Sequence, residues 1–461
     1  MATKPQIIVA GILDTKGNEI RFLAERIRAA GGEPTIMELT VGGKPAGFAD
    51  IPVGELAARV GRTPDELAGL ERAKAADIVM AGGRLLATEL LAQGKLDGMI
   101  AFGGSMGSSI AAHIMQGLPI GVPKLLLSTM TSGDVRPYVG TKDIAMAYPI
   151  AEVGLNKVTR KVLNNAAAAI VGMASAPALE ATAEKPLIGC MMFGVTTPTV
   201  LHASKYFEDR GYDVMINHAV GSGGRSMEEL IADGYIVGML DITTHEIADE
   251  LFGGVLGAGP DRLTAAGKKG IPQVVSVGGL DLLNFGPRDT LPKKYEEELN
   301  VPGRAIYVHN PTVTCAGVSV AESERLGREI GTKLSAATGP TVLCIPLRGW
   351  GAVDIATPDK ALGWAGPGAG PVWWPDPGHP EWSRRDAAFV AGYLQTADLA
   401  KPNLDVLAVD RHMNDPAFAD LMAKLLEEML AGRWVKGSHH ERPDVVAVTK
   451  EGLTPRMPQV V

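Results

Sequence analysis

Two stretches of the chain share one pattern of hydrophobic and polar positions. Each has an apolar run, a turn of small residues, an amphipathic segment, a glycine and a second apolar run followed by Gly-Gly; they start at Ile7 (IIVAGILDTKGNEIRFLAERIRAAGGEPTIMELTVGG) and at Ile188 (IGCMMFGVTTPTVLHASKYFEDRGYDVMINHAVGSGG). A continuous apolar run followed by a 3.6-residue period is typical of a parallel strand buried on both faces and its crossover helix. The pattern predicts an α/β fold class: two doubly wound Rossmann-like domains with parallel sheets, related as an internal duplication.

The sequence between the two repeats predicts where the first domain ends. Residues 172–186 are rich in Ala, Pro and Glu and have no apolar period, which is typical of a domain boundary. We expect an N-terminal nucleotide-binding domain over residues 1–183, a C-terminal domain over residues 184–435, and an extended C-terminal arm over residues 436–461, which is polar and contains proline.

A segment rich in tryptophan interrupts the second domain. Residues 348–386 are dominated by Pro, Gly and Trp, and five of the six tryptophans of the chain fall there; the sixth is Trp434. Loops longer than about 12 to 15 residues are uncommon unless they are functional or disordered. We interpret this one as an ordered lid or active-site wall, as an oligomer contact, or as plain surface packing.

Composition narrows the class of protein. With 44 Lys and Arg against 52 Asp and Glu the net charge is −8, which argues against a nucleic-acid partner. Three scattered cysteines fit core packing in a reducing compartment better than a disulfide framework. No apolar stretch reaches 18 residues, and the start of the chain lacks a signal-peptide pattern. We therefore expect a cytoplasmic protein with no membrane span.

Candidate chemistry in the first domain lies in three loops that follow predicted strands, where open α/β sheets bind ligands. The loop GILDTKGNE contains Lys16, which suits a phosphate, and Asp14, which suits Mg2+. FGGSMGSS, residues 102–109, runs directly into a helix, so its backbone N–H groups and the helix dipole favour an anion; a tight turn that needs small residues is the alternative. STMTSGDVRPYVGTKD is the third loop, and its many polar residues suit a ligand.

Histidines mark the second domain. His218, His245, His309 and His412 each come just after a predicted strand, and Glu246, Asn310 and Asp415 are at similar places. Neutral histidine is a common metal ligand and is well suited to proton transfer near pH 7. These residues predict either a functional cluster, with or without a transition metal, or separate loop histidines; no HxH or HExxH spacing supports the metal. The loop GSGGRSMEE adds a second anion cradle.

These motifs, with DITTHEIADELFGG, AGPDRL, HNPTVT and HMNDPAFA, resemble the ATP-binding domain family typified by the N-terminal domain of the tomato mosaic virus resistance protein. The resemblance runs from about Ile7 to Met429. It implies two Rossmann-like subdomains, a homodimer, and ATP with Mg2+ bound mainly by the first subdomain. Three departures fall in the second domain: CAGV after HNPTVT, where the family usually has a Met-Arg-Thr stretch, His245 in DITTHE, and the Trp-rich segment. We infer a changed substrate rather than a changed nucleotide.

The residues that we assign fall into three groups. The resemblance places nucleotide contacts on Asp14, Thr15, Lys16, Gly103, Gly104, Ser105, Gly107, Ser128, Thr129, Ser132 and Asp134. His218, His309, His412 and Asp415 fall on positions where the family also has His, His, His and Asp; with Glu246 they are the catalytic candidates, and the three histidines are the metal candidates. The substrate-binding candidates are Gly223, Gly224, Arg225, Thr244, His245 and Asn310.

Three functions remain open. The first is an ATP-using enzyme that acts on a small anionic, carboxylate-bearing substrate in the cleft between the two domains, by positioning and electrostatic stabilisation of phosphoryl or adenylyl transfer. The second is a hydrolase or carbon–carbon lyase that uses the His218, His309 and His412 cluster. The third is a nonenzymatic ATP-binding regulatory module. A homodimer or higher homo-oligomer is expected for each, because the Trp-rich segment would otherwise be a costly exposed apolar patch.

Overall fold

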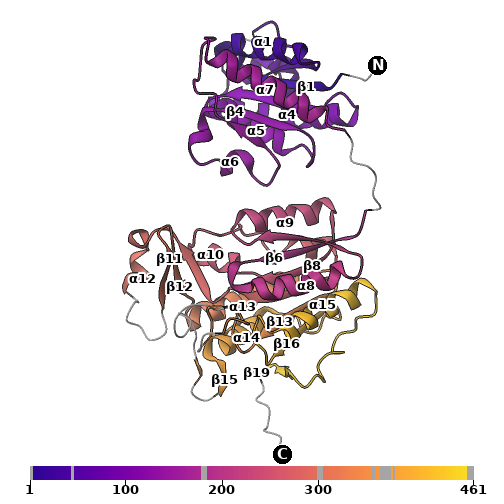
Figure 1. Cartoon of the computed structure of the whole chain (residues 1–461), viewed down its shortest axis with the longest axis vertical. Helices are drawn as coiled ribbons and strands as arrows, with labels where there is room; N and C mark the ends of the chain where they lie inside the picture. The colour runs from indigo at the N-terminus through magenta and orange to yellow at the C-terminus, as the bar shows by residue number, and fades with distance from the viewer. Residues whose placement is uncertain are drawn as a thin grey trace, which may run out of the picture. The chain divides into compact units, whose positions relative to one another are not determined.

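The computed structural model consists of two compact units, Met1–Ala181 and Thr182–Val461 (Figure 1). It describes residues 4–42, 46–177, 184–297, 305–355, 359–363, 375–376 and 379–453, with only the backbone for 375–376 and 379–383. The division lies two residues before the predicted boundary. Each unit is an α/β domain with a parallel sheet, so the predicted fold class is confirmed.

The sheet of the N-terminal unit has five parallel strands in the order β2-β1-β3-β4-β5. Their bounds are β1 Gln6–Gly11, β2 Glu33–Glu38, β3 Gly98–Gly103, β4 Lys124–Ser128 and β5 Ala145–Ala147. Alternate residues of β1 pack on opposite faces, because Ile7 and Val9 join one apolar cluster and Ile8 and Ala10 another. Burial on both faces explains why the strand is apolar at every position.

Helices cover both faces of this sheet. α1 (Leu13–Ala29) and α7 (Thr159–Ala174) contribute Leu23 and Ile170 to one cluster, whereas α4 (Arg72–Ala92) and α5 (Ser105–Gln116) contribute Val79 and Ile110 to the other. Three short helices complete the unit: α2 Val53–Arg59, α3 Pro64–Ala68 and α6 Arg136–Val139. The N-terminal unit is therefore doubly wound, with its own core.

The main sheet of the C-terminal unit has the order β17-β16-β13-β9-β8-β6-β7. All its pairings are parallel except that of β16 with β17. The bounds are β6 Leu187–Met192, β7 Asp213–His218, β8 Ile236–Thr243, β9 Gln273–Gly278, β13 Thr341–Pro346, β16 Leu404–Val409 and β17 Val445–Val446. The first five strands of this sheet follow the same spatial order as those of the first unit, second-first-third-fourth-fifth, as an internal duplication predicts.

Helices again cover both faces, and Figure 1 shows α8 and α15 against this sheet. α8 (Thr197–Glu208) and α15 (Pro416–Leu430) share a cluster with Cys190 and Cys344, while α13 (Val320–Ser335) and α14 (Arg384–Thr396) pack on the opposite face. The other helices are α9 Ser222–Asp233, α10 Glu246–Phe252, α11 Ala265–Lys269 and α12 Lys293–Glu297. All three cysteines are free and buried, as core packing predicts.

Two expectations for this unit differ from the structure. Residues 348–386 are not one irregular loop: Trp350 is fully buried, the short strands β14 (Pro375–Asp376) and β15 (His379–Ser383) pair, and α14 begins at Arg384. The remaining residues, 356–358, 364–374 and 377–378, lie outside the described ones. The segment from residue 436 is not an extended arm as far as residue 453, because β17 pairs with β16, and the strands β18 (Val448–Thr449) and β19 (Gly452–Leu453) form a second pair.

A three-stranded antiparallel sheet is inserted between β9 and β13. Its order is β10-β12-β11, with β10 Leu282–Phe285, β11 Ile306–Asn310 and β12 Val313–Gly317. The insertion places His309 on a different sheet from His218. Among the described helices, none combines the length and the apolar character that a membrane crossing requires.

Candidate functional site

Three strand ends meet at the carboxyl edge of the N-terminal sheet. Gly11 on β1 pairs with Phe102 on β3, and Gly103 on β3 pairs with Ser128 on β4. The strand order reverses between β1 and β3, with α1 and α5 leaving toward opposite faces. Ligands of doubly wound sheets bind in the crevice at such a switch point. The structure thus brings together the three loops that the sequence predicted for the nucleotide.

The N-cap residue of α5 is Gly104. Among the described residues, no side chain accepts a hydrogen bond from the backbone N–H groups of this helix start, and the Ser108 hydroxyl donates to the carbonyl oxygen of Gly103. Gly103 leaves no room for a side chain, since a Cβ there would lie 2.9 Å from backbone atoms of Gly107 and Ser108. The buried Ser108 hydroxyl lies 2.6 Å from that of Ser128 and so ties α5 to β4. The first turn therefore offers backbone N–H groups to an anion that approaches closely.

Lys16 is the buried cation of the same crevice. Its side chain is 5% exposed, and its Nζ lies 5.3 Å from the centre of the Phe102 ring. Nζ donates to the carbonyl oxygen of Glu152 at 2.7 Å and lies 3.6 Å from Oε1 of the same residue. An ammonium can donate three hydrogen bonds, yet within the described residues the Glu152 carbonyl is its one acceptor. Lys16 therefore retains donor capacity at the switch point.

A cavity of about 800 Å³ opens beside the first turn of α1. Asp14 and Thr15 line it and are exposed. Two arginines also line it, Arg21 at 3.8 Å from the Phe48 ring centre and Arg160 stacked on Phe22. This volume is typical of small-molecule sites.

The loop after β4 mostly satisfies its own polar groups. The Ser128 side chain accepts a hydrogen bond from the backbone N–H of Met130 and caps the short 3-10 helix η1 (Thr129–Ser132). Asp134 is exposed, and hydrogen bonds from Arg136 lower its pKa to about 2. Of the nucleotide contacts predicted in this loop, Ser128 lies at the strand ends, whereas Ser132 and Asp134 lie on the exposed part of the loop.

The second predicted anion cradle, at the start of α9, is filled by the protein itself. The carboxylate of Glu246 accepts hydrogen bonds from the backbone N–H groups of Gly221, at 2.6 Å, and Gly224, at 3.1 Å. Gly224 is glycine because a Cβ there would lie 2.2 Å from this carboxylate. Glu246, expected as a catalytic residue, thus takes the place expected for a substrate anion.

A buried arginine holds this carboxylate. Arg262 is 1% exposed; its Nε donates to Glu246 at 2.7 Å, and its two terminal nitrogens bind Asp241 in a bidentate pair. Asp241, Glu246 and Glu228 raise the Arg262 pKa further above its already high value, against the effect of burial. Because every charge in this network has a partner, the network indicates a structural role for Glu246 and Arg262 at the carboxyl end of β8.

His245 is also committed to internal contacts. It is fully buried, its Nε2 hydrogen-bonds the carbonyl oxygen of Ala219, and its ring lies 4.2 Å from that of Phe193. Burial lowers its pKa to about 4, so it is neutral near pH 7. Its neighbour Thr244 is buried and donates to the carbonyl oxygen of Ser276. Neither side chain is placed as expected for substrate contacts.

The structure does not gather the three candidate histidines. His218 is exposed at the end of β7 and His412 is buried after β16. Four strands separate β7 from β16, which is about 24 Å of sheet at the usual strand spacing. His309 is exposed on β11 of the inserted sheet. In the part of the chain that is described, no three His, Cys, Asp or Glu side chains are arranged to hold a metal ion.

The remaining candidates of this unit have local roles. Asp415 is the N-cap of α15, accepting from the backbone N–H of Ala417 and pairing with Arg411. Asn310 is exposed and accepts from Thr312. His412 accepts a hydrogen bond on Nδ1 from the backbone N–H of Asn414, and burial lowers its pKa.

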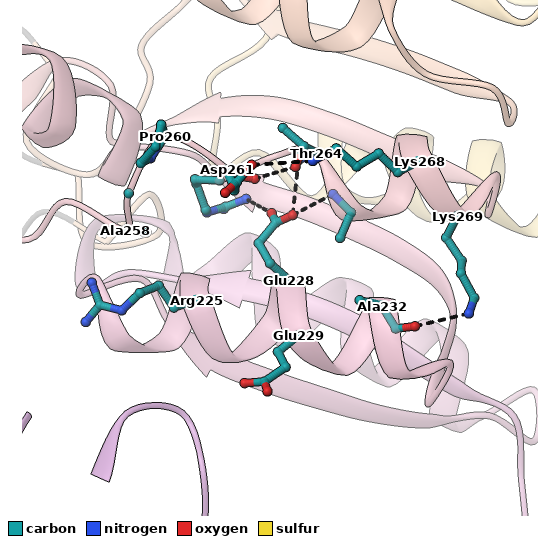
Figure 2. A pocket seen from close by; sticks show the side chains of 13 residues that line it. Arg225, Glu228, Glu229, Ala232, Ala258, Pro260, Asp261, Thr264, Lys268 and Lys269 are labelled. Atoms are coloured by element: carbon teal, nitrogen blue, oxygen red, sulfur yellow. Dashed lines mark hydrogen bonds and ion pairs between the residues drawn. The ribbon is translucent and has the colours of Figure 1, made fainter. Parts of the chain in front are cut away.

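Figure 2 shows the side chains around a second cavity, of about 630 Å³, between α9 and residues 258–269. Glu228 points toward the start of α11 and accepts from three backbone N–H groups, including those of Thr264 and Ala265. Arg225 and Lys269 lie at its margin and donate to the carbonyl oxygens of Gly257 and Ala232. Glu228 and Lys269 are thus bound within the unit, while Arg225 is exposed and hydrogen-bonds Gly257.

Several residues with notable environments escaped sequence reasoning. They are Glu152 beside Lys16, Arg262 in the buried network, and the pair Asp354 and Arg385. Of these, Arg262, Asp354 and Arg385 are at most 3% exposed. Arg262 belongs to AGPDRL, one of the motifs that carries the family resemblance, and this was the signal available for it. The others carry no local pattern, since their partners are distant in sequence.

Comparison with known proteins agrees with this two-unit organisation. Residues 5–178 match the description "Uncharacterised protein family (UPF0261) N-terminal domain" and residues 185–362 match that of its C-terminal domain. A UPF0261 protein of Clostridium tetani is 40% identical over 427 residues, which cover 92% of this chain and 99% of that protein. The chain belongs to the UPF0261 family. The predicted relationship to the tomato protein is borne out as membership of one sequence family.

Tomato proteins are further relatives of this UPF0261 chain. The ToMV susceptible protein tm-1(GCR26) of Solanum lycopersicum is 33% identical over 385 residues, and the ToMV resistance protein Tm-1(GCR237) is 32% identical over 380 residues. Each alignment covers 78% of this chain and 50% of the tomato protein. The UPF0261 chain thus corresponds to about half of the tomato proteins.

Proposed function

We propose that the N-terminal unit binds ATP with Mg2+ and that the protein is an enzyme that uses this nucleotide to act on a small anionic, carboxylate-bearing substrate. The observation that carries the proposal is the meeting of two groups at the β1/β3 switch point. One is the glycine-lined, uncapped start of α5; the other is the buried ammonium of Lys16 with unused donors. Together they suit the β- and γ-phosphates, because fixed N–H dipoles and a cation stabilise negative charge in a site of low dielectric.

The neighbouring groups support a nucleotide rather than a simple anion. The cavity of about 800 Å³ beside α1 has room for a nucleoside, and the exposed Asp14 carboxylate lines it. Mg2+ in nucleotide sites is held by one or two carboxylates together with phosphate oxygens and water, and Asp14 would be such a ligand. Mg2+ would neutralise phosphate charge there.

The acid–base alternative has lost its main support, because His218, His309 and His412 are not gathered and Glu246 is bound within the unit. The regulatory alternative shares the same nucleotide site and differs in whether ATP is consumed. Release of ADP or AMP in the presence of a panel of carboxylic acids separates it from the enzyme.

Isothermal titration calorimetry with ATP and Mg2+ tests the binding site. The wild-type protein should bind, and Lys16→Met should bind at least about ten-fold more weakly, since the variant keeps the apolar stem but removes one close ion pair. Lys95→Ala is the matched control, because Lys95 is exposed just before the start of β3, at the opposite edge of the sheet. Undiminished binding by Lys16→Met would remove this residue from the proposed site.

A further inference from the structure

Glu152 occupies the part of the crevice where the proposed ligand anion would bind. A Cβ built on Gly104, the N-cap of α5, would lie 2.4 Å from its Oε1, so the carboxylate touches this helix end. The same Oε1 lies 3.6 Å from the Lys16 ammonium. A carboxylate that contacts both the helix start and the buried cation has the position and charge sign of a phosphate oxygen.

The carboxylate is held weakly. Its side chain is 60% exposed, and in the described part of the chain the 3.6 Å ion pair with Lys16 is its one polar contact, with no hydrogen bond. By contrast, the backbone around it is fixed. The Gly154 N–H donates to the buried Glu19 at 2.5 Å, and the Thr159 hydroxyl donates to the Gly154 carbonyl oxygen at 2.7 Å. A rotation of one side chain therefore moves the charge without moving the loop.

Lys16 would form more hydrogen bonds if a ligand anion replaced the Glu152 carboxylate. It is nine-tenths buried, and it uses one of its three donors, on the carbonyl oxygen of Glu152. The acceptor of that hydrogen bond is a backbone oxygen, so the bond persists when the Glu152 side chain swings out. The remaining donors then meet the incoming anion at hydrogen-bond distance instead of a carboxylate at 3.6 Å.

We propose that Glu152 is an internal competitor for the anion site, a carboxylate gate that the phosphates of the ligand must displace from the start of α5 and from Lys16. This inference rests on the proposed function, since it concerns the same site. The gate neutralises Lys16 in the free protein and selects for ligands with more than one negative charge, because a singly charged anion would merely replace an equal charge.

Glu152→Gln tests the gate, because it keeps the shape of the side chain and removes the charge. We expect it to bind ATP about ten-fold more tightly than the wild type, and inorganic tripolyphosphate, which has no nucleoside, by a similar factor. Glu33→Gln is the control, since Glu33 is partly exposed and begins β2 at the opposite edge of the sheet. Its affinities should equal those of the wild type.

Calorimetry with and without Mg2+ separates the possible results. Tighter binding by Glu152→Gln in both conditions supports the gate. Unchanged binding overturns it and leaves the nucleotide site in place. Weaker binding with Mg2+ alone also overturns it, because Glu152 would then be a metal ligand. Absence of ATP and tripolyphosphate binding in both the wild type and Glu152→Gln overturns the proposed function and the gate together.

Discussion

Asp281 shows at the scale of one residue how burial shapes the C-terminal unit. It is fully buried just after β9, and no side chain hydrogen-bonds to either carboxylate oxygen in the described residues. Burial, and secondly the charge of Asp354, raise its pKa to about 7. One guanidinium, that of Arg385, faces both these carboxylates and that of Asp386.

This raised pKa predicts a loss of stability as the pH rises. An unfolded Asp has a pKa of about 3.9, so between about pH 4 and 7 the unfolded state is ionised and the folded state holds the proton. The free energy of unfolding therefore falls as the pH rises through this range and levels off above about pH 7. The asparagine in Asp281→Asn cannot ionise, so this variant should not lose unfolding free energy through this group as the pH rises.

Urea unfolding at pH 5 and pH 8 measures the effect. The stability difference between Asp281→Asn and the wild type should widen in favour of the variant by about 2–3 kcal/mol from pH 5 to pH 8, which is about two units of pKa. Asp249, whose pKa burial also raises to about 7, is present in both proteins and cancels. Asp213→Asn, at an exposed position, is the control; a constant difference at both pH values would contradict a raised pKa.

At the scale of elements, the strands and the meeting of the first unit's loops at one sheet edge were predictable for different reasons. Strands buried on both faces must be apolar at each position, so the runs at Ile7 and Ile188 revealed β1 and β6. The loops at the proposed nucleotide site followed from topology, since parallel strands end at one edge. The partners of the helix starts were not predictable: Glu246 lies 22 residues from Gly224, and Glu152 lies 136 residues from Lys16.

The starts of α9 and α5 are therefore both rich in glycine, but their backbone N–H groups meet different acceptors. A glycine is the N-cap of both helices. Glu246 and Arg262 fill and neutralise the start of α9, whereas in the described part of the chain the weakly held carboxylate of Glu152 contacts the start of α5. Local sequence shows the donors of a helix start and does not show the acceptor, which tertiary packing supplies. For the same reason, single histidines after strands did not reveal that the strands lie far apart.

Glu246→Ala tests the structural role at α9. It should destabilise the protein by about 3–5 kcal/mol, because it leaves a buried guanidinium partly unpaired and two backbone N–H groups without an acceptor. ATP affinity should stay at the wild-type value, since the proposed nucleotide site lies in the other unit. Chemical denaturation and calorimetry measure both. Asp209→Asn, which removes an exposed ion pair with Lys205, should change the free energy of unfolding by no more than about 1 kcal/mol.

At the scale of the molecule, the chain is two domains of one topology that have diverged. The first five strands of each sheet share one order, but the second unit carries an added antiparallel sheet, further strands and a filled cradle. The predicted departures from the family pattern at residues 315–318 and His245 fall in this second unit, on β12 and after β8. The homodimer that the resemblance implies stays a prediction.

Independent cores predict that the N-terminal unit folds alone, and the ATP site that we propose lies within it. All five strands of its sheet and both apolar clusters that cover it come from residues before 178, and a domain of this size can bury enough apolar surface to be stable. A fragment of residues 1–177 should therefore unfold cooperatively. At an ATP concentration 100 times the dissociation constant, ATP with Mg2+ should stabilise it by about 2.7 kcal/mol. A fragment of residues 184–461 should show no such effect.

A thermal shift in the second fragment, or none in a folded first fragment, would place the nucleotide elsewhere. An equal shift in the first fragment and the whole chain would show that the β1/β3 crevice needs nothing from the second unit to bind it.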